Sequence, residues 1–249
     1  MREFETLHAI VDEKKLELPD QALVVVAHHD DEKMWNMQSH LAQRGVGLTV
    51  LVLTDSSGRD LKGYTPERLA KARWTEGTAS AQEAGLAGLH RIGLPDGQLS
   101  SYIDYAIEFG EQFIDDKAVV FAPNYGDEHP DHVAANIVAQ KLAGDATPLY
   151  EMDTLTGYDQ YGNVLVPTEK DIYQPLSTRT ARKEKKIYKE LNPTQTKNIP
   201  WHQRKAMFDA LGMTSRRGRE RGIPHAAVLF KANNAINDPT RKWLQRSVA

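Results

Sequence analysis

Short apolar runs alternate with longer amphipathic stretches over roughly the first 155 residues of the chain. The run Leu-Val-Val-Val-Ala at 23–27 is continuous, which is typical of a strand buried on both faces of a parallel sheet. Further strands are predicted at 48–54, 90–94, 118–122 and 149–152. Helical patterns fill the intervals at 32–44, 66–84, 102–114 and 130–142. This alternation predicts an α/β fold, Rossmann-like, with a mostly parallel sheet and helices on both faces.

Beyond about residue 155 the pattern is less regular. It predicts a hairpin, two helices and a late edge strand, at 159–166, 178–191, 201–211 and 226–231. No repeat, low-complexity segment or shift of composition marks a linker. We therefore expect a single domain over 1–249, with a catalytic core at about 20–155 and a C-terminal cap with the late strand at about 156–249.

Proline and glycine mark the ends of two of these helices. Pro66 and Pro130 stand in the first turns, where a missing backbone N–H does no harm, and Gly85 follows the last periodic residue of the 66–84 stretch. These residues therefore predict helix starts at Pro66 and Pro130 and a helix end at Gly85.

Composition narrows the classes of function. The 249 residues include 31 Lys plus Arg and 34 Asp plus Glu, a formal net charge of −3, which argues against a nucleic-acid partner. Cysteine is absent, so zinc fingers and disulfides are excluded and any metal must be held by His, Asp or Glu. With no apolar run near 18 residues and no signal-peptide pattern, we expect no membrane span and a cytoplasmic protein.

Two polar clusters follow predicted strands. His28-His29-Asp30-Asp31 comes directly after the first strand, and His129-Pro130-Asp131-His132 follows the strand at 118–122 by a short loop. Both clusters should lie at the carboxyl edge of the sheet, where ligands bind. Three nitrogen or oxygen ligands plus water is the usual arrangement of a catalytic zinc, and we expect His28, Asp31 and His132 to be those ligands. Helix capping is an alternative role for Asp30 or Asp31.

Four motifs resemble the LmbE/PIG-L family of zinc-dependent N-acetylglucosaminyl deacetylases. The run 27–32 is similar to the family's A-H-P-D-D-E signature, and 129–132 to its H-x-x-H motif. Arg73-Trp74-Thr75-Glu76 resembles its R-x-x-E helix and 93–97 its L-P-D-G loop. The motifs stand in the family's order over about residues 22–143. His29 departs from the pattern, because the family usually has proline there, and it introduces a second candidate ligand.

The resemblance implies an N-deacetylase that acts on an amino sugar or an N-acetylglucosamine conjugate, with Zn²⁺ held by the three ligands named above. Asp30 would be the general base that takes a proton from the attacking water. His129 would stabilise the intermediate electrostatically, and either protonated Asp30 or a charged His129 would supply a proton to the leaving amine. Asp131 would hydrogen-bond the imidazole of His129, or else serve only as a first-turn acid.

The same resemblance points to substrate-binding residues. Arg73 and Asp96 match positions that the family uses around the sugar, and the alternative is an ion pair with Glu76 or a neighbouring loop. Tyr125 is a candidate donor to the acetyl oxygen, since Asp127 stands two residues before His129, where some family members have a tyrosine.

Two other classes of function stay open. A metal-dependent phosphoesterase also uses His and Asp clusters, but normally with two metal ions about 3.5–4 Å apart. A non-catalytic sugar- or nucleotide-binding module would not need Asp30. The partner we expect is a small-molecule amino-sugar substrate or glycoconjugate. The ligand set would accept Fe²⁺ as well as Zn²⁺. The sequence leaves open which N-acetylated compound is the substrate and whether the chain forms a homo-oligomer.

Overall fold

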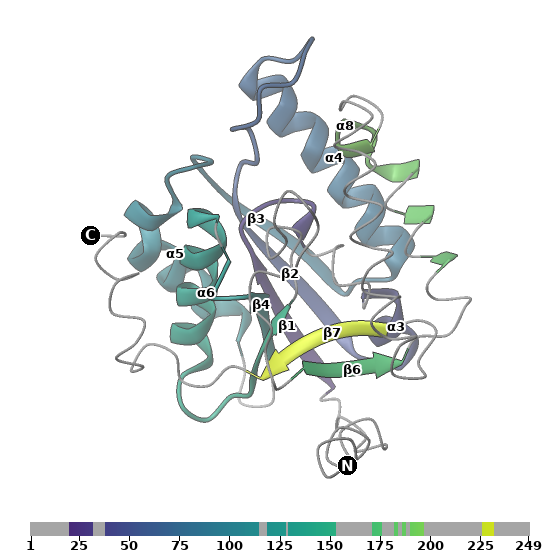
Figure 1. The fold of residues 1–249 in the computed structure, drawn as a ribbon, viewed down its shortest axis with the longest axis vertical. Helices are drawn as coiled ribbons and strands as arrows, with labels where there is room; N and C mark the ends of the chain where they lie inside the picture. Colours follow the sequence, from purple (N-terminus) through teal and green to yellow (C-terminus); the bar gives the residue numbers. More distant parts are fainter. Residues whose placement is uncertain are drawn as a thin grey trace, which may run out of the picture.

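The computed structural model describes residues 20–31, 38–114, 119–127, 129–152, 171–175, 182–183, 186–187, 190–196 and 226–231. Among these residues, seven strands form one sheet in the order β3-β2-β1-β4-β5-β7-β6 (Figure 1). They are β1 (Gln21–Val26), β2 (Gly47–Thr54), β3 (Gly88–Leu94), β4 (Val119–Pro123), β5 (Leu149–Met152), β6 (Asp171–Pro175) and β7 (Ala226–Lys231). Strands β1 to β5 are parallel, whereas β7 is antiparallel to both β5 and β6. The expected mostly parallel sheet is confirmed.

Strand β1 lies at the centre of the parallel part. Its Val24 pairs with Val50 of β2 on one side and with Phe121 of β4 on the other. The chain moves outward from β1 through β2 to β3 and then returns to β4 on the opposite side of β1. Strand order therefore reverses between β1 and β4, and open α/β sheets bind ligands at the carboxyl ends of the strands at such a point.

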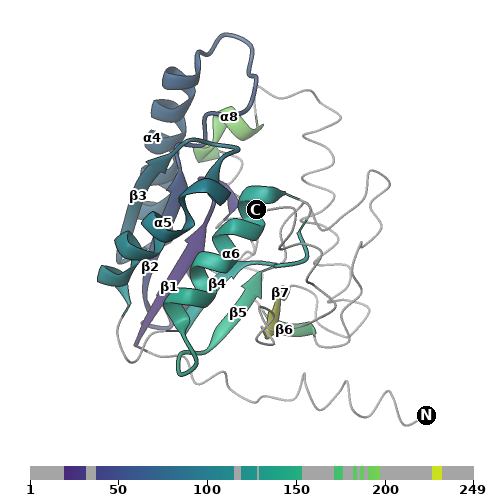
Figure 2. The same ribbon diagram turned by 90° about the vertical axis from the view of Figure 1, so that its left-hand side faces the viewer.

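Helices cover both faces of the sheet, as the pattern predicted (Figures 1 and 2). They are α3 (Gln38–Gln43), α4 (Pro66–Ala84), α5 (Ile103–Gly110), α6 (Pro130–Ala143) and α8 (Pro193–Thr196), with short 3-10 turns η1 (Leu99–Tyr102) and η2 (Glu111–Phe113). Helices α5 and α6 lie on one face, and α3 and α4 on the other. The short helix α8 lies beside α4.

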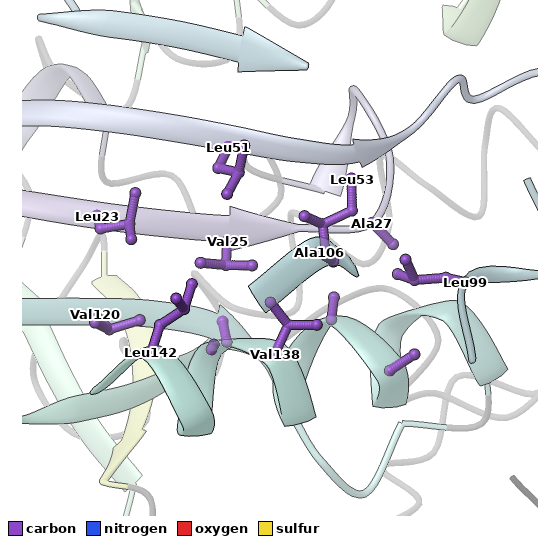
Figure 3. Packing of buried hydrophobic residues seen from close by; sticks show 14 of the residues in the cluster. Leu23, Val25, Ala27, Leu51, Leu53, Leu99, Ala106, Val120, Val138 and Leu142 are labelled. Carbon is purple, nitrogen blue, oxygen red and sulfur yellow. The ribbon is translucent and has the colours of Figure 1, made fainter. Parts of the chain in front are cut away.

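The continuous apolar run of β1 is explained by two core layers. Leu23 and Val25 face the layer that contains Val138 of α6 (Figure 3). Val24 faces the opposite layer, with Leu41 of α3. Because both faces of β1 are covered, no position along it has to be polar.

The helix boundaries follow the local chemistry. Thr65 caps α4 by accepting a hydrogen bond from Arg68 N, and Gly85 ends it with a left-handed φ of 85°. The single helix predicted at 102–114 is wrong in detail, because 3-10 turns flank the shorter helix α5. Gly110 is the last residue of α5, and a Cβ there would lie 2.6 Å from Leu142 Cδ1 of α6, so a larger residue would require the Leu142 side chain to move.

The C-terminal third is described in part. Strand β7 confirms the late strand, while β6 has a weak signal, five residues ending in proline, and was not predicted. Those described residues that fall within 178–191 are helical; the predicted hairpin at 159–166 and helix at 201–211 lie outside the described residues. None of the helices in the described part of the chain is both long enough and apolar enough to cross a bilayer.

Candidate metal centre

The turn after β1 is fixed by the end of β2. Thr54 Oγ1 donates to Ala27 O at 2.8 Å, and His29 N donates to Ser56 Oγ at 3.1 Å. Ser56 has a left-handed φ of 59°, and Arg73 Nη1 donates to its carbonyl at 2.9 Å. Such a backbone conformation persists only where surrounding contacts hold it, and here those contacts place the turn that carries His28.

A second loop, between β4 and α6, positions His132. Asp127 Oδ1 accepts a hydrogen bond from His129 N at 2.8 Å, and Asp127 Oδ2 lies 2.9 Å from His132 Nδ1. Pro130 begins α6, so His132 stands in its first turn and points back toward β1. Asp127 thus fixes the start of the helix and the orientation of the imidazole together.

The two loops bring three buried donors together. His132 Nε2 lies 3.1 Å from Asp31 Oδ1 and 3.3 Å from His28 Nδ1, and His28 Nδ1 lies 3.3 Å from Asp31 Oδ2. A tetrahedral zinc with bonds of about 2.0–2.1 Å has ligand–ligand edges of about 3.3 Å. Each pair of residues in the predicted set is therefore close to the ligand–ligand spacing of a zinc site, with Asp31 facing His132 through Oδ1 and His28 through Oδ2.

The second ring nitrogen of each imidazole, the one that points away from the ligand set, faces a carboxylate. His132 Nδ1 faces Asp127, while His28 Nε2 lies 3.2 Å from Asp96 Oδ1 and 3.5 Å from Asp131 Oδ2. Metal-binding histidines usually donate their second N–H to such a group, which fixes the tautomer and the ring orientation. The surroundings of both histidines therefore favour metal binding through His28 Nδ1 and His132 Nε2.

The charges of the cluster favour a cation. Burial lowers the pKa of His28, but the charge of Asp31 and hydrogen bonds to Asp131, Asp31 and Asp96 outweigh burial and raise that pKa well above its ordinary value. Burial likewise opposes the charges of Asp31 and His132. The attraction between these two charges nevertheless keeps the pKa of Asp31 well below its usual range and raises the pKa of His132 to about 10. Four carboxylates, Asp31, Asp96, Asp127 and Asp131, contact the two imidazoles, so a divalent cation bound to neutral imidazoles offsets two of the four negative charges.

Other triplets of donors overlap with this set. His28, His129 and His132 offer ring nitrogens within 4.8 Å of one another, and so do donor atoms of His28, Asp96 and Asp131. The contacts of 3.1–3.3 Å among His28, Asp31 and His132 use both oxygens of Asp31, and both alternatives need the same His28. We therefore treat His28, Asp31 and His132 as the candidate ligands.

His129 and Asp30 lie next to this set. The His129 ring stacks on His132 at a centroid distance of 4.7 Å and meets His28 edge-on at 4.9 Å. Burial, followed by the positive charges of His132 and His28, lowers the pKa of His129. Asp30 is half-buried in the turn between His29 and Asp31.

Residues 23–143 match the family model described as PIG-L, GlcNAc-PI de-N-acetylase. The chain contains a PIG-L family region. The match spans all four sequence motifs and confirms the predicted resemblance. No curated protein matches the chain.

Solved structures share the fold at low identity. The zinc inhibited form of teicoplanin deacetylase is 15% identical, with a TM-score of 0.68 over 84% of this chain and 97% of that one. The N,N'-diacetylchitobiose deacetylase from Pyrococcus horikoshii is 14% identical, with a TM-score of 0.68 over 96% and 94%. The 4-carboxy-2-hydroxymuconate hydratase from Pseudomonas putida is 17% identical, with a TM-score of 0.64 over 86% and 96%.

Within the PIG-L region, the predicted substrate residues contact the protein itself. Arg73 is 5% exposed and holds the Ser56 carbonyl, and Tyr125 is 1% exposed and packs against Val133. Asp96 lies against His28 and accepts a hydrogen bond from Gly58 N. None of the three predicted sugar contacts therefore projects into open solvent.

Contrary to what the resemblance implied, the carboxylate of Asp131 does not hydrogen-bond the imidazole of His129. Its carboxylate accepts hydrogen bonds from Gly97 N at 2.6 Å and Leu99 N at 3.1 Å, and faces His28. Its backbone N–H, rather than its carboxylate, contacts His129 Nδ1, at 3.3 Å. The carboxylate of Asp131 therefore lies against the loop after β3. The spacing of residues along α6 does not reveal this contact.

His29, the residue that replaces the PIG-L proline, turns away from the ligand set. Its ring lies 5.1 Å from that of Trp74, and a Cβ on Gly77 would lie 2.8 Å from its Nδ1. His29 is thus directed toward α4, whereas the neighbouring His28 faces His132. This geometry favours His28 over His29 as the ligand.

One residue of the PIG-L region that sequence reasoning missed is Asp127. It was noted only for standing where a tyrosine was sought, yet it is the carboxylate partner of His132. The signal in the sequence is a carboxylate five residues before a candidate metal-binding histidine, since such histidines usually pair with a carboxylate.

Proposed function

We propose that the chain is a metal-dependent hydrolase that removes the N-acetyl group from an amino sugar or an N-acetylglucosamine conjugate. The observation that carries the proposal is the buried set of His28, Asp31 and His132 with donor spacings of 3.1–3.3 Å, at the strand-order reversal of a PIG-L region. The similar solved structures of deacetylases support this proposal. Zn²⁺ is the metal we propose, since the donor spacing fits its tetrahedral geometry.

Bound there, the metal supplies Lewis acidity, which makes water nucleophilic near neutral pH. Asp30 adjoins the ligand Asp31 in the same turn, and its half-buried carboxylate accepts the proton of the attacking water. That proton then passes to the nitrogen of the leaving amine as the C–N bond breaks. Amide and water thereby yield acetate and free amine.

The contacts of His129 support a role as a hydrogen-bond donor. Asp131 N–H donates to its Nδ1, so the neutral ring carries its proton on Nε2. The lowered pKa of His129, caused first by burial and then by the neighbouring imidazoles, also favours the neutral form. A fixed Nε2–H next to the ligand set stabilises negative charge that develops on the acetyl oxygen.

The phosphoesterase alternative is weaker on the described residues. A two-metal site needs two separate ligand sets, whereas the donor triplets found here all share His28. The similar hydratase structure shows that this fold also carries a different reaction, so fold alone does not select deacetylation.

Amine release from a panel of N-acetylated sugars, sugar nucleotides and glycolipid headgroups tests the proposal. We expect chelator-sensitive release by the wild type, and we expect Asp30→Asn to retain its metal while turnover falls by about 10²–10⁴-fold. Asp60→Asn removes the same charge at an exposed position and should leave turnover unchanged. Full activity of Asp30→Asn, or no release from any substrate by the metal-loaded wild type, would overturn the proposal.

A further inference from the structure

Asp96 is held in place by three neighbouring segments. Its Oδ1 lies 3.2 Å from His28 Nε2, and its Oδ2 accepts a hydrogen bond from Gly58 N at 2.9 Å. The loop that carries it is fixed in turn by Asp131, which accepts hydrogen bonds from Gly97 N and Leu99 N. A side chain fixed at both oxygens is preorganised toward the protein rather than left free for a ligand.

The approach of Gly58 to Asp96 leaves no space for a side chain. A Cβ built on Gly58 would lie 2.8 Å from both Cγ and Oδ1 of Asp96. The loop after β2 therefore depends on glycine here to bring its N–H to the carboxylate. Any larger residue would push Asp96 away from His28 without changing a charge in the centre.

His28 Nε2 has one hydrogen to donate and two carboxylates within reach. Asp96 is the nearer at 3.2 Å, and Asp131 lies at 3.5 Å with its two oxygens already accepting backbone N–H groups. Hydrogen bonds weaken toward that longer distance, so the N–H belongs to Asp96. A proton on Nε2 leaves the lone pair of the neutral ring on Nδ1, the atom that faces Asp31 and His132.

We propose that Asp96 is a positioning residue that holds the metal ligand His28 in its Nε2–H tautomer, beyond the sugar contact expected from the sequence. This inference rests on the proposed metal-dependent function. A sugar contact alone predicts a higher KM for Asp96 variants with metal affinity unchanged. Positioning predicts weaker metal binding even in the absence of substrate.

The Asp96→Asn variant separates the two roles because an amide cannot satisfy both neighbours. With its oxygen toward Gly58 N–H, its NH₂ opposes His28 Nε2–H; with the amide flipped, its NH₂ opposes Gly58 N–H instead. The first orientation favours the opposite tautomer of His28, which places a proton on the metal-facing nitrogen. We expect zinc affinity to fall by about 10–100-fold.

Gly58→Ala is the second variant, and it leaves every charge of the centre in place. We expect it to weaken zinc binding in the same direction and by less, because the loop relaxes in part. Asp60→Asn is the matched control, since it removes a carboxylate from an exposed position of the same loop. Its zinc affinity should equal that of the wild type.

The experiment measures zinc affinity by competition with a chromophoric chelator, together with ¹⁵N shifts of labelled histidines in the zinc-loaded proteins. We expect the wild type to show His28 protonated at Nε2, and Asp96→Asn to lose that signal and bind zinc more weakly. Unchanged zinc affinity and tautomer with a raised KM would overturn the inference and leave Asp96 as a sugar contact. If instead the wild type binds no metal, the proposed function itself fails, which is a separate result.

Discussion

Glu76 of α4 and Thr194 of α8 are joined by two hydrogen bonds across 118 positions of sequence. Thr194 N donates to Oε1 at 2.9 Å, and Thr194 Oγ1 donates to Oε2 at 2.5 Å. Asn192 strengthens the same junction by donating to Ser80 Oγ, one turn further along α4. The glutamate of the R-x-x-E motif therefore fastens part of the C-terminal third to the core.

Replacing Glu76 with Gln should destabilise the protein by about 1.5–3 kcal/mol, because a buried charged acceptor is exchanged for an amide that opposes Thr194 donors. Equilibrium urea unfolding measures the loss. Thr194→Val removes the hydroxyl with little change of shape, and the double variant should be less destabilised than the sum of the two single variants. Strict additivity would show that the bonds do not act together.

Asp127→Asn should weaken zinc binding by about 10–100-fold, since His132 Nδ1–H loses its carboxylate partner. The amide oxygen can still accept one hydrogen bond, so the fold should survive. Chelator competition gives the affinity, and circular dichroism checks the fold. Wild-type affinity in this variant would mean that Asp127 only caps the start of α6 through His129 N.

We expect one metal ion per chain in the wild type and none in His132→Ala, by elemental analysis. Adding zinc at 100 times its dissociation constant should stabilise the wild type by about 2.7 kcal/mol and leave His132→Ala unaffected. His90→Ala, at an exposed histidine outside the ligand set, provides the control and should behave like the wild type. Two ions per chain would favour the phosphoesterase alternative.

Gly77→Ala tests the fit between α4 and His29. In the wild-type background, the added Cβ would lie 2.8 Å from His29 Nδ1, and this clash should destabilise the protein by about 1–3 kcal/mol. Replacing a glycine within a helix opposes this loss by about 1 kcal/mol. In a His29→Ala background the clash is gone, so the same substitution should stabilise. Thermal unfolding of the four proteins measures this reversal of sign, and equal effects in both backgrounds would contradict the contact.

The fold was largely predictable because its signals are local. The continuous apolar run of β1 and the prolines at the starts of α4 and α6 define elements without reference to the rest of the chain. Strand β6 carries no such signal, because it becomes a strand through pairing with β7, more than 50 residues later. The helix predicted at 102–114 is replaced by the shorter helix α5 between two 3-10 turns.

In the candidate site, too, the residues with local signals were predictable and those placed by tertiary contacts were not. His28 and His132 lie at the sheet edge as predicted, because His28 closely follows β1 and His132 follows the loop after β4. The partners on their far nitrogens, Asp96 and Asp127, depend on loop conformations that spacing does not encode. Asp131 illustrates the difficulty, since its carboxylate and its backbone N–H serve different neighbours.

The position of β7 between β5 and β6 also sets an order of assembly. Strands β1 to β5 can pair as soon as the first 152 residues exist, but β6 has no neighbour in this sheet until residues 226–231 arrive. A nascent or shortened chain that stops before Ala226 would leave the backbone edge of β5 open to pairing with another molecule. Among the described strands, β7 is therefore the one that covers the edge of β5, and β6 forms the outer edge on this side of the sheet.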